Sequence, residues 1–388
     1  MRSAELFAGC GGLALGLSRS GFDSAVMVEH DSNAVATVAF NAAKGVAHVA
    51  EWKLRHLDVR DIDWRTWRGE VDLVSGGPPC QPFAIGGKKR GHADRRDMWP
   101  EAVRAVAEIS PDAFLFENVR NIASPTFRSY LDWIVACLCF PDRPRRKDES
   151  HASHLARLNA TTSPASYSVT WQVLNAADYG APQLRHRVII QGLSASLQAK
   201  PAPMVPTHSR MRLLWDQYVT GAYWHRHGLA APVRPEASSD AARLRALRVL
   251  KAPPAGRPWV TLRDAIADLG LPNGRNSHVF QAGARSYTGH TGSLLDLPAK
   301  ALKAGDHGVP GGENMVRSPD GAIRYLTMRE ASRLVGLPDD YAFPRSWTET
   351  MRQLGNAVPT QLSEAAGRHI RAQLEIARRS PAISVAAE

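Results

Sequence analysis

Short apolar runs alternate with longer amphipathic stretches over the first half of the chain. This alternation is typical of an α/β protein, in which strands and helices follow one another. A helix is predicted over Trp99–Ile109, where apolar residues recur at helical spacing and charged residues take the other side. The predicted strands are Ser3–Phe7, Ala25–Glu29, Val71–Ser75, Ala113–Phe116, Val169–Leu174 and Val188–Leu193.

The pattern changes twice along the chain. Proline, serine and mixed charges interrupt it at residues 140–166, which we interpret as a surface insertion. From about residue 196 the sequence is first proline-rich, then arginine-rich with weak periodicity. We therefore expect one domain over 1–193, a second over 194–350, and a terminal segment, 351–388, that returns to the first domain.

Three helices are predicted in the second half. The segments 261–272 and 327–338 each begin with threonine followed three residues later by an acid, and each contains a late glycine. This is the pattern of a capping box and a glycine stop. A terminal helix that packs against the rest of the protein is predicted by apolar residues at steps of four, which are Leu362, Ala366, Ile370 and Leu374.

Composition narrows the class of protein. A hydrophobic content of 44% and a charged content of 22% are those of an ordinary globular chain, while the net charge of +11 favours a polyanionic partner. The 4 cysteines have no framework spacing. No secretory signal is recognisable, and no apolar run approaches the roughly 20 residues that span a bilayer. We expect a reduced, cytoplasmic protein without membrane contact.

A ligand site is predicted at the end of the first strand, in the segment ELFAGCGGLALGL (5–17). Its glycines leave the backbone amides at a helix start open to a ligand, although a tight turn alone would also explain them. Glu29 and Asp58 come at the next two strand ends, where an acid can accept hydrogen bonds from ribose hydroxyls. This combination resembles the S-adenosylmethionine site of class I methyltransferases.

Cys80 stands in SGGPPCQPF (75–83), directly after the third predicted strand. Three prolines restrict the backbone around the sulfur, which suggests an aimed thiol, although a lone buried cysteine is more often plain packing. A metal site is not expected, because no second cysteine or histidine lies nearby at ligand spacing. An aimed thiol without a metal points to a nucleophile.

Two further segments carry polar residues beside apolar runs. Glu117 and Asn118 end one run, and an acid leaving such surroundings is a candidate for a raised pKa, or simply an acid at a helix start. Arg185 and Arg187 alternate and would share one face of a strand that begins early. Such a pair suits a phosphate or a base edge, and a solvated basic edge strand is the equally simple alternative.

Taken together, these segments resemble the DNA cytosine-5 methyltransferases of the bacterial modification type. The matching segments follow the family's order between residues 5 and 359, and they are FAGCGG, VEHD, LDV, GGPPCQPF, ENV, QLRHR, RYLTMREASRLVGLPDDY and QLGNAVP. The chain departs from the family at Ala84, where serine is usual, and at His186, where an acid or lysine is frequent. Neither change removes a catalytic group.

The resemblance implies a Rossmann-like class I sheet with helices on both faces, plus a smaller, irregular target-recognition domain. S-adenosyl-L-methionine is the implied cofactor. Cys80 matches the nucleophile that adds to C6 of cytosine, Glu117 the acid at N3 with Asn118 beside it, and Arg185 and Arg187 the groups that hold the base. The implied cofactor positions are Phe7, Ala8, Gly9, Cys10, Gly11, Gly12, Glu29, His30, Asp58, Val59, Pro79, Asn356 and Ala357.

The implied substrate is a cytosine flipped out of double-stranded DNA. Residues 84–97 match the family's mobile loop, and about 194–323 match the region that reads the sequence. The residues predicted to contact DNA are Gln81, Lys88, Lys89, Arg90, His307 and Asn314. For His307 and Asn314, which flank glycines, an ordinary turn is the simpler interpretation.

Two other functions are compatible with parts of this pattern. A tRNA cytosine-5 methyltransferase shares the scaffold, but its variable region is shorter and more uniform. A catalytically silent, sequence-specific DNA-binding protein would not need the intact Cys80, Glu117, Arg185 and Arg187. We expect an active monomer in an orphan modification system or in a restriction–modification system, the latter with a cognate restriction endonuclease as a further partner.

Overall fold

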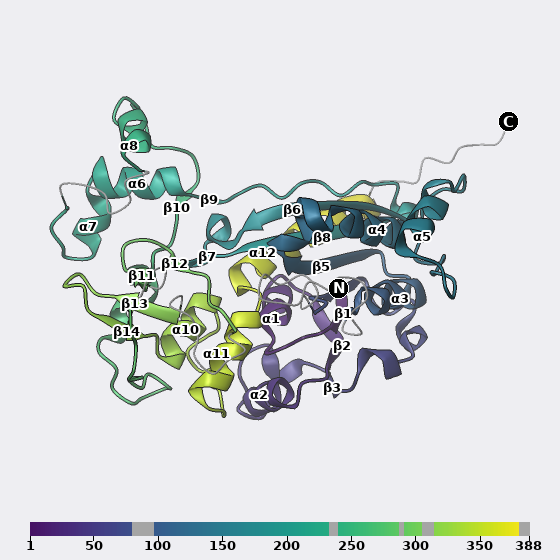
Figure 1. The fold of residues 1–388 in the computed structure, drawn as a ribbon, viewed down its shortest axis with the longest axis horizontal. Helices are drawn as coiled ribbons and strands as arrows, with labels where there is room; N and C mark the ends of the chain where they lie inside the picture. Colours follow the sequence, from purple (N-terminus) through teal and green to yellow (C-terminus); the bar gives the residue numbers. More distant parts are fainter. Residues whose placement is uncertain (80–96, 233–239, 287–290, 305–313, 380–388) are drawn as a thin grey trace.

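The structure is a computed structural model that describes residues 1–79, 97–232, 240–286, 291–304 and 314–379. Its centre is a seven-stranded sheet with the order β3-β2-β1-β4-β5-β8-β6 (Figure 1). The strands are β1 (Arg2–Leu6), β2 (Asp23–Glu29), β3 (Leu54–His56), β4 (Leu73–Gly76), β5 (Ala113–Val119), β6 (Tyr167–Asn175) and β8 (His186–Ser194). In the described part of the chain, no helix has the length and apolar character needed to cross a membrane.

All of the predicted strands are confirmed, and their directions explain the sheet. From β3 to β5 each neighbouring pair is parallel, whereas β8 runs antiparallel to both of its neighbours, β5 and β6. The sequence did not predict β3, because only three residues pair and only one of them is partly buried. The sheet is of the α/β type expected.

Alternate residues of β5 point to opposite faces of the sheet and bury both. Phe114 and Phe116 pack with α3 (Trp99–Ile109) and α4 (Arg128–Cys139), whereas Ala113 and Leu115 pack with α1 (Gly12–Arg19) and α12 (Thr360–Arg379). Helices therefore cover both faces, as expected. The helix predicted over residues 99–109 and the terminal helix are both confirmed.

The terminal helix α12 packs closely on α1, the first helix of the chain. A Cβ added at Gly16 would lie 2.1 Å from Ser363 Oγ, and one added at Gly367 would lie 2.2 Å from Ser20 Oγ. Ser363 Oγ also donates a hydrogen bond to the carbonyl of Gly12 at 3.0 Å. Small residues on both helices thus allow α12 to pack closely against α1.

The segment 140–166, interpreted above as an insertion, contains a helix that was not predicted, α5 (His151–Asn159), which packs on α4. The family-typical part of the chain is not interrupted by a disordered stretch here, because α5 is an ordered helix. The buried His154 fixes the contact between α5 and α4. Its Nδ1 accepts a hydrogen bond from the indole of Trp133 at 3.1 Å, and its Nε2 lies 3.0 Å from the carbonyl of Arg143. Burial lowers the pKa of His154 and so favours the neutral ring that can accept one bond and donate the other.

The second half of the chain forms smaller units beside the sheet (Figure 1). The helices α6 (Arg210–Tyr218), α7 (Ala222–Arg226) and α8 (Ala241–Leu247) enclose two small apolar clusters of their own. A short sheet contains β11 (Ser293–Leu294), β13 (Met315–Arg317) and β14 (Ile323–Tyr325). The link back to the first half of the chain is β12 (Ala299–Lys300), which pairs in parallel with β7 (Gln183–Leu184).

Both predicted capping boxes are present. Thr261 and Asp264 cap α9 (Leu262–Ile266), which continues as a 3-10 turn before Gly270. Thr327 and Glu330 cap α10 (Met328–Val335), which ends at Gly336 with a left-handed φ of 85°. These residues fix where α9 and α10 begin, because each threonine hydroxyl and each acid satisfies a backbone amide that the helix itself leaves free.

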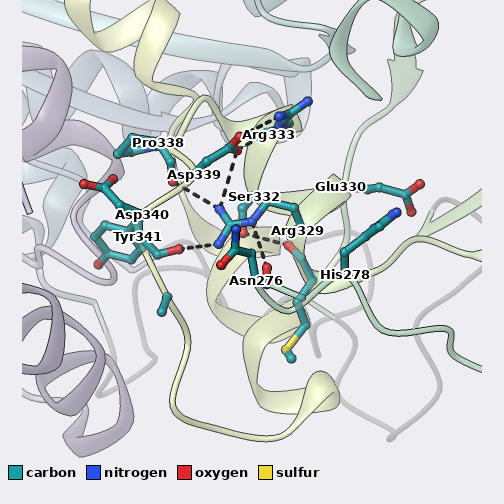
Figure 2. A network of polar contacts seen from close by, with 12 residues as sticks. Asn276, His278, Arg329, Glu330, Ser332, Arg333, Pro338, Asp339, Asp340 and Tyr341 are labelled. Atoms are coloured by element: carbon teal, nitrogen blue, oxygen red, sulfur yellow. Dashed lines mark hydrogen bonds and ion pairs between the residues drawn. The ribbon is translucent and has the colours of Figure 1, made fainter. Parts of the chain in front are cut away.

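Arg329 on α10 joins the distant loop at Asn276 to the segment that follows α10 (Figure 2). Its buried guanidinium donates hydrogen bonds to the carbonyls of Asn276, Pro338 and Tyr341 at distances between 2.9 and 3.1 Å. Asn276 and Ser277 both have positive φ, of 47° and 63°, so the loop is in a conformation that these residues seldom adopt. The hydrogen bond from the Arg329 guanidinium to the carbonyl of Asn276 stabilises this loop conformation.

We predict that Arg329→Met lowers the free energy of unfolding by about 3 kcal/mol, because one buried and two partly buried carbonyls lose their donor. Arg368→Met is the matched control, since Arg368 lies on the exposed side of α12 in a single pair with Glu364. The control should change stability by less than about 0.5 kcal/mol. Urea unfolding of both variants measures the difference, and equal stabilities would contradict the role given to Arg329.

Candidate active site

A pocket of about 460 Å³ lies at the carboxyl ends of β1, β2, β4 and β5. This is the edge of a parallel sheet where ligands are usually bound. The pocket brings together predicted residues from segments that lie far apart in the chain. Those that line it are Phe7, Ala8, Gly9, Cys10, Gly12, Glu29, His30, Asp58, Val59, Pro79, Glu117, Asn118, Arg187, Asn356 and Ala357.

The glycine turn between β1 and α1 forms the floor of the pocket. Gly9 lines it with a φ of 55°, and a Cβ added there would meet no protein atom within 4 Å, so it would occupy the cavity. Gly11 is not part of the lining. It caps α1 with a φ of 84°, and a Cβ at this position would strike the ring of Trp52. Gly11 thus allows the turn to pack against Trp52, whereas the absence of a side chain at Gly9 keeps the cavity open.

Glu29 is held in a fixed orientation at the end of β2. One carboxylate oxygen accepts a hydrogen bond from the amide of Gly9 at 2.7 Å. The other accepts from the amides of His30 and Asp31 at 2.8 and 2.6 Å. A carboxylate oxygen can accept more than one bond, so Glu29 remains able to receive hydroxyl donors from a ligand in the pocket.

Asp58, after β3, is kept ionised by Arg60. The side chain of Arg60 donates to both carboxylate oxygens, at 2.9 and 2.5 Å. These bonds lower the pKa of Asp58 to about 2. Asp58 therefore acts only as a hydrogen-bond acceptor at neutral pH.

Glu117, at the end of β5, forms a buried ion pair with Arg187 of β8. Burial raises the pKa of Glu117, while the positive charges of Arg187 and Arg185 act in the opposite direction. The neighbouring Asn118 donates a hydrogen bond to the carbonyl of Pro78 at 3.0 Å. These contacts hold the ends of β4 and β5 together and place the Glu117 carboxyl group in the same pocket as Pro79.

Arg185 does not line the pocket, and the structure separates it from Arg187. Its guanidinium is buried and donates to the carbonyls of Leu302 at 2.8 Å and Gly355 at 2.5 Å. The strand is interrupted at this residue, between β7 and β8, so the two arginines do not continue one regular strand face. Arg185 instead ties the segment after β12 to the residue before Asn356.

Several predicted residues cannot be placed. Cys80, which directly follows Pro79 in the sequence, lies outside the described residues, as do Gln81, Lys88, Lys89, Arg90 and His307. Asn314 is described and is buried. Its amide accepts from the backbone nitrogen of Lys303 and donates to the carbonyl of Lys303, both at 3.0 Å. This arrangement favours the structural interpretation of Asn314 over a base contact.

Several polar residues that sequence reasoning missed line this site, among them Asp31 and Arg60. Arg352 and Gln353 line the pocket from α11 (Trp347–Asn356), one helical turn before the predicted Asn356. Helical spacing back from Asn356 would have identified them.

Glu5 on β1 was also missed. It does not line the pocket, but it is buried and close enough to Glu29 to feel its charge, and burial raises its pKa to about 8. The signal for Glu5 was an acid within a predicted buried strand.

Comparison with known proteins gives consistent matches over most of the chain. A family model described as "C-5 cytosine-specific DNA methylase" matches residues 1–139, 146–225 and 274–372. The Type II methyltransferase M.NgoMIV of Neisseria gonorrhoeae is 28% identical over 376 residues, covering 95% of this chain and 96% of that protein. The Type II methyltransferase M.PspPI of Psychrobacter sp. (strain TA137) is 30% identical over 370 residues, covering 94% and 78%.

Among solved structures, the Dnmt2 methyltransferase of S. pombe is similar in fold. The two structures agree with a TM-score of 0.56 at 16% identity, over 97% of this chain and 99% of the other. At this identity the likeness concerns the fold alone. It agrees with the arrangement of strands and helices expected from the sequence.

We predict that the wild-type protein loses stability as pH rises and that Glu5→Gln does not show this loss. Because the pKa of Glu5 is raised from 4.5 to about 8, the folded protein retains a proton that the unfolded chain releases. The free energy of unfolding of the wild type should therefore fall, relative to the variant, as pH rises from 4.5 to about 8. Urea unfolding across this range measures it, with the exposed Glu51→Gln as control. Parallel pH profiles of wild type and Glu5→Gln would contradict the prediction.

Proposed function

The chain belongs to the family of C-5 cytosine-specific DNA methylases and is a DNA cytosine-5 methyltransferase, and we propose that it methylates a flipped-out cytosine through a covalent adduct with Cys80. One observation carries the proposal. A single pocket unites the glycine turn, Glu29 and Asp58 with Glu117, Arg187 and the residue directly before Cys80. The pocket can therefore hold both the adenosine of the cofactor and the target base.

The residues of the glycine turn fit S-adenosyl-L-methionine, which supplies an electrophilic methyl group on a sulfonium. The missing Cβ of Gly9 leaves room for the cofactor against the backbone. Glu29, oriented by three amides, accepts hydrogen bonds from the ribose hydroxyls. The ionised Asp58 accepts from the amino group of the adenine. Asn356 and Ala357 close the pocket from the end of α11.

Cys80 provides the nucleophile because cytosine is too weakly nucleophilic at C5 to take a methyl group unaided. Addition of the thiolate to C6 forms a sulfur–carbon bond, breaks the aromaticity and makes C5 electron-rich. C5 would then take the methyl carbon as the bond between that carbon and the sulfonium sulfur breaks and leaves a thioether. Transfer of the C5 proton to a base and expulsion of the thiolate would restore the ring. The prolines around Cys80 present the sulfur to the base.

Glu117 stabilises the adduct at the opposite edge of the ring. Burial favours its protonated form, which can share a proton with N3 as negative charge develops there. Arg187 fixes the orientation of the carboxyl group through their ion pair and contacts the base from the same side. Asn118 holds the backbone of Pro78, two residues before the nucleophile.

Arg185 acts as a positioning residue, in contrast to Arg187. Its two hydrogen bonds hold Gly355 and Leu302, so it fixes the pocket wall that carries Asn356. An added Cβ at Gly355 would lie 2.2 Å from the backbone nitrogen of Ala304, which shows how closely the two segments approach. Arg185 therefore affects cofactor binding more directly than the chemical step.

Duplex DNA is the substrate, and residues 194–350 form the domain that recognises its sequence. We propose that the enzyme acts as a monomer in the cytoplasm, as part of a restriction–modification system with a cognate endonuclease. The names of the Type II relatives support this context. Bisulfite sequencing of plasmid DNA from cells that express the chain would identify the methylated cytosine.

We predict that a duplex containing 5-fluorocytosine at the methylated position traps the enzyme covalently, because fluorine cannot leave C5 as a proton does. Wild type and Cys139→Ala should give a complex that resists denaturation, since Cys139 lies on α4 and does not line the pocket. Cys80→Ala should give none and should still bind the duplex. A trapped complex with Cys80→Ala, or its absence with wild type on a confirmed site, would contradict the mechanism.

Substitution of the two arginines should separate their roles. We predict that Arg187→Gln lowers kcat by about 100-fold with little change in the KM for S-adenosylmethionine, because a stabilising charge next to the base is removed. Arg185→Gln should raise that KM and lower the free energy of unfolding, because two buried carbonyls lose their donor. Steady-state kinetics and urea unfolding test the pair, and identical kinetic effects would contradict the division of roles.

A further inference from the structure

Residues 226–273 lie between two matched segments of the family model and belong to neither. This stretch contains α8 and α9, and it begins at the last residue of α7. In Figure 1, α6, α7 and α8 gather at one end of the long axis, and α4 and α5 lie at the other end. The α8 region thus lies outside the matched parts of the family model, within the domain proposed to recognise DNA.

The α8 helix is held rigidly on α6. Leu244 and Leu247 are buried in a cluster with Leu214 of α6. Asp240, just before α8, has a buried carboxylate that pairs with Arg210 at 2.8 Å and with Arg243 at 3.2 Å. Apolar contacts therefore hold one side of α8 against α6, and an ion pair holds the start of the helix. The opposite side of α8 is consequently fixed in position.

The described acids of this region are all engaged with other cations. From residue 210 to residue 300, each described aspartate pairs with an arginine that does not belong to the exposed side of α8. These pairs are Asp216–Arg212, Asp240–Arg210, Asp264–Arg226, Asp268–Arg333 and Asp296–Arg263. No acid of the described region is left to neutralise the exposed side of α8.

Three exposed cations lie on α8 and directly after it. Arg245, Arg248 and Lys251 follow one another at three-residue steps along α8 and the turn after it, and all three are exposed. Among the residues that the structure describes, none of these side chains has an ion-pair or hydrogen-bond partner. We call these three residues the α8 basic segment.

We propose that the α8 basic segment binds phosphates of duplex DNA outside the bases that the enzyme recognises. The proposal rests on the proposed function, which makes DNA the substrate. Phosphates along a duplex are the anions that a row of uncompensated cations fits. Base reading needs side chains held in fixed planes by their neighbours, and no described neighbour holds these three exposed side chains in place. The segment therefore adds affinity without adding sequence selectivity.

The test compares two triple variants that remove the same charge. Arg245→Gln/Arg248→Gln/Lys251→Gln removes the α8 basic segment. Arg145→Gln/Arg146→Gln/Lys147→Gln removes three exposed cations of the insertion beside α5, at the opposite end of the molecule. Binding to a short duplex of scrambled sequence is measured by fluorescence anisotropy over a salt series, so the recognised sequence need not be known.

The α8 variant should bind the duplex more weakly and with a shallower salt dependence. Each phosphate that a cation neutralises adds about 0.9 to the slope of log K against log salt, so the slope of this variant should be smaller by about 2 to 3. The control should keep the slope of the wild type. On the methylated sequence, the α8 variant should show a higher KM for DNA at an unchanged kcat and an unchanged preference over scrambled DNA.

Two results would overturn the proposal. Equal slopes for wild type and the α8 variant would show that the segment does not bind DNA. Equal reductions in both triple variants would show that only net charge matters. Failure of the proposed function is distinguishable from either result, because wild-type protein would then neither methylate plasmid DNA nor bind the duplex in a salt-dependent way.

Discussion

The site depends on one constraint, which is that β1, β2, β4 and β5 run parallel. Parallel strands place their carboxyl ends at the same edge, so residues that follow four separate strands meet in one pocket. The far wall comes from α11 and the residues between α11 and α12, which α12 holds in place by packing on α1. Sheet direction thus selects the residues of the pocket, and the contact between the two ends of the chain closes it.

Residues of the same type have different roles in this structure because their environments differ. Arg185 and Arg187 are two residues apart, yet one is bound by backbone carbonyls and the other pairs with Glu117 in the pocket. Glu29 and Glu5 both lie near the glycine turn, but three amides orient the first, whereas burial favours the neutral form of the second. The environment of each residue, more than its type, decides what it can do.

The sequence was most informative where local chemistry determines structure. Apolar runs predicted the strands, and the capping boxes predicted the starts of α9 and α10 correctly, because both signals act over a few residues. It was silent on the antiparallel direction of β8, on the short strand β3 and on α5, which depend on tertiary contacts. The face that Arg185 and Arg187 would share depended on an unbroken strand, and the strand is interrupted at Arg185.

The packing of α12 on α1 has a consequence for synthesis of the enzyme. The residues that complete the pocket, from Arg352 to Val358, and the helix that secures them come after every other pocket residue in the chain. A nascent polypeptide still attached to the ribosome can form most of the sheet and cannot enclose a cofactor. Closure of this pocket wall therefore waits until translation has passed α12.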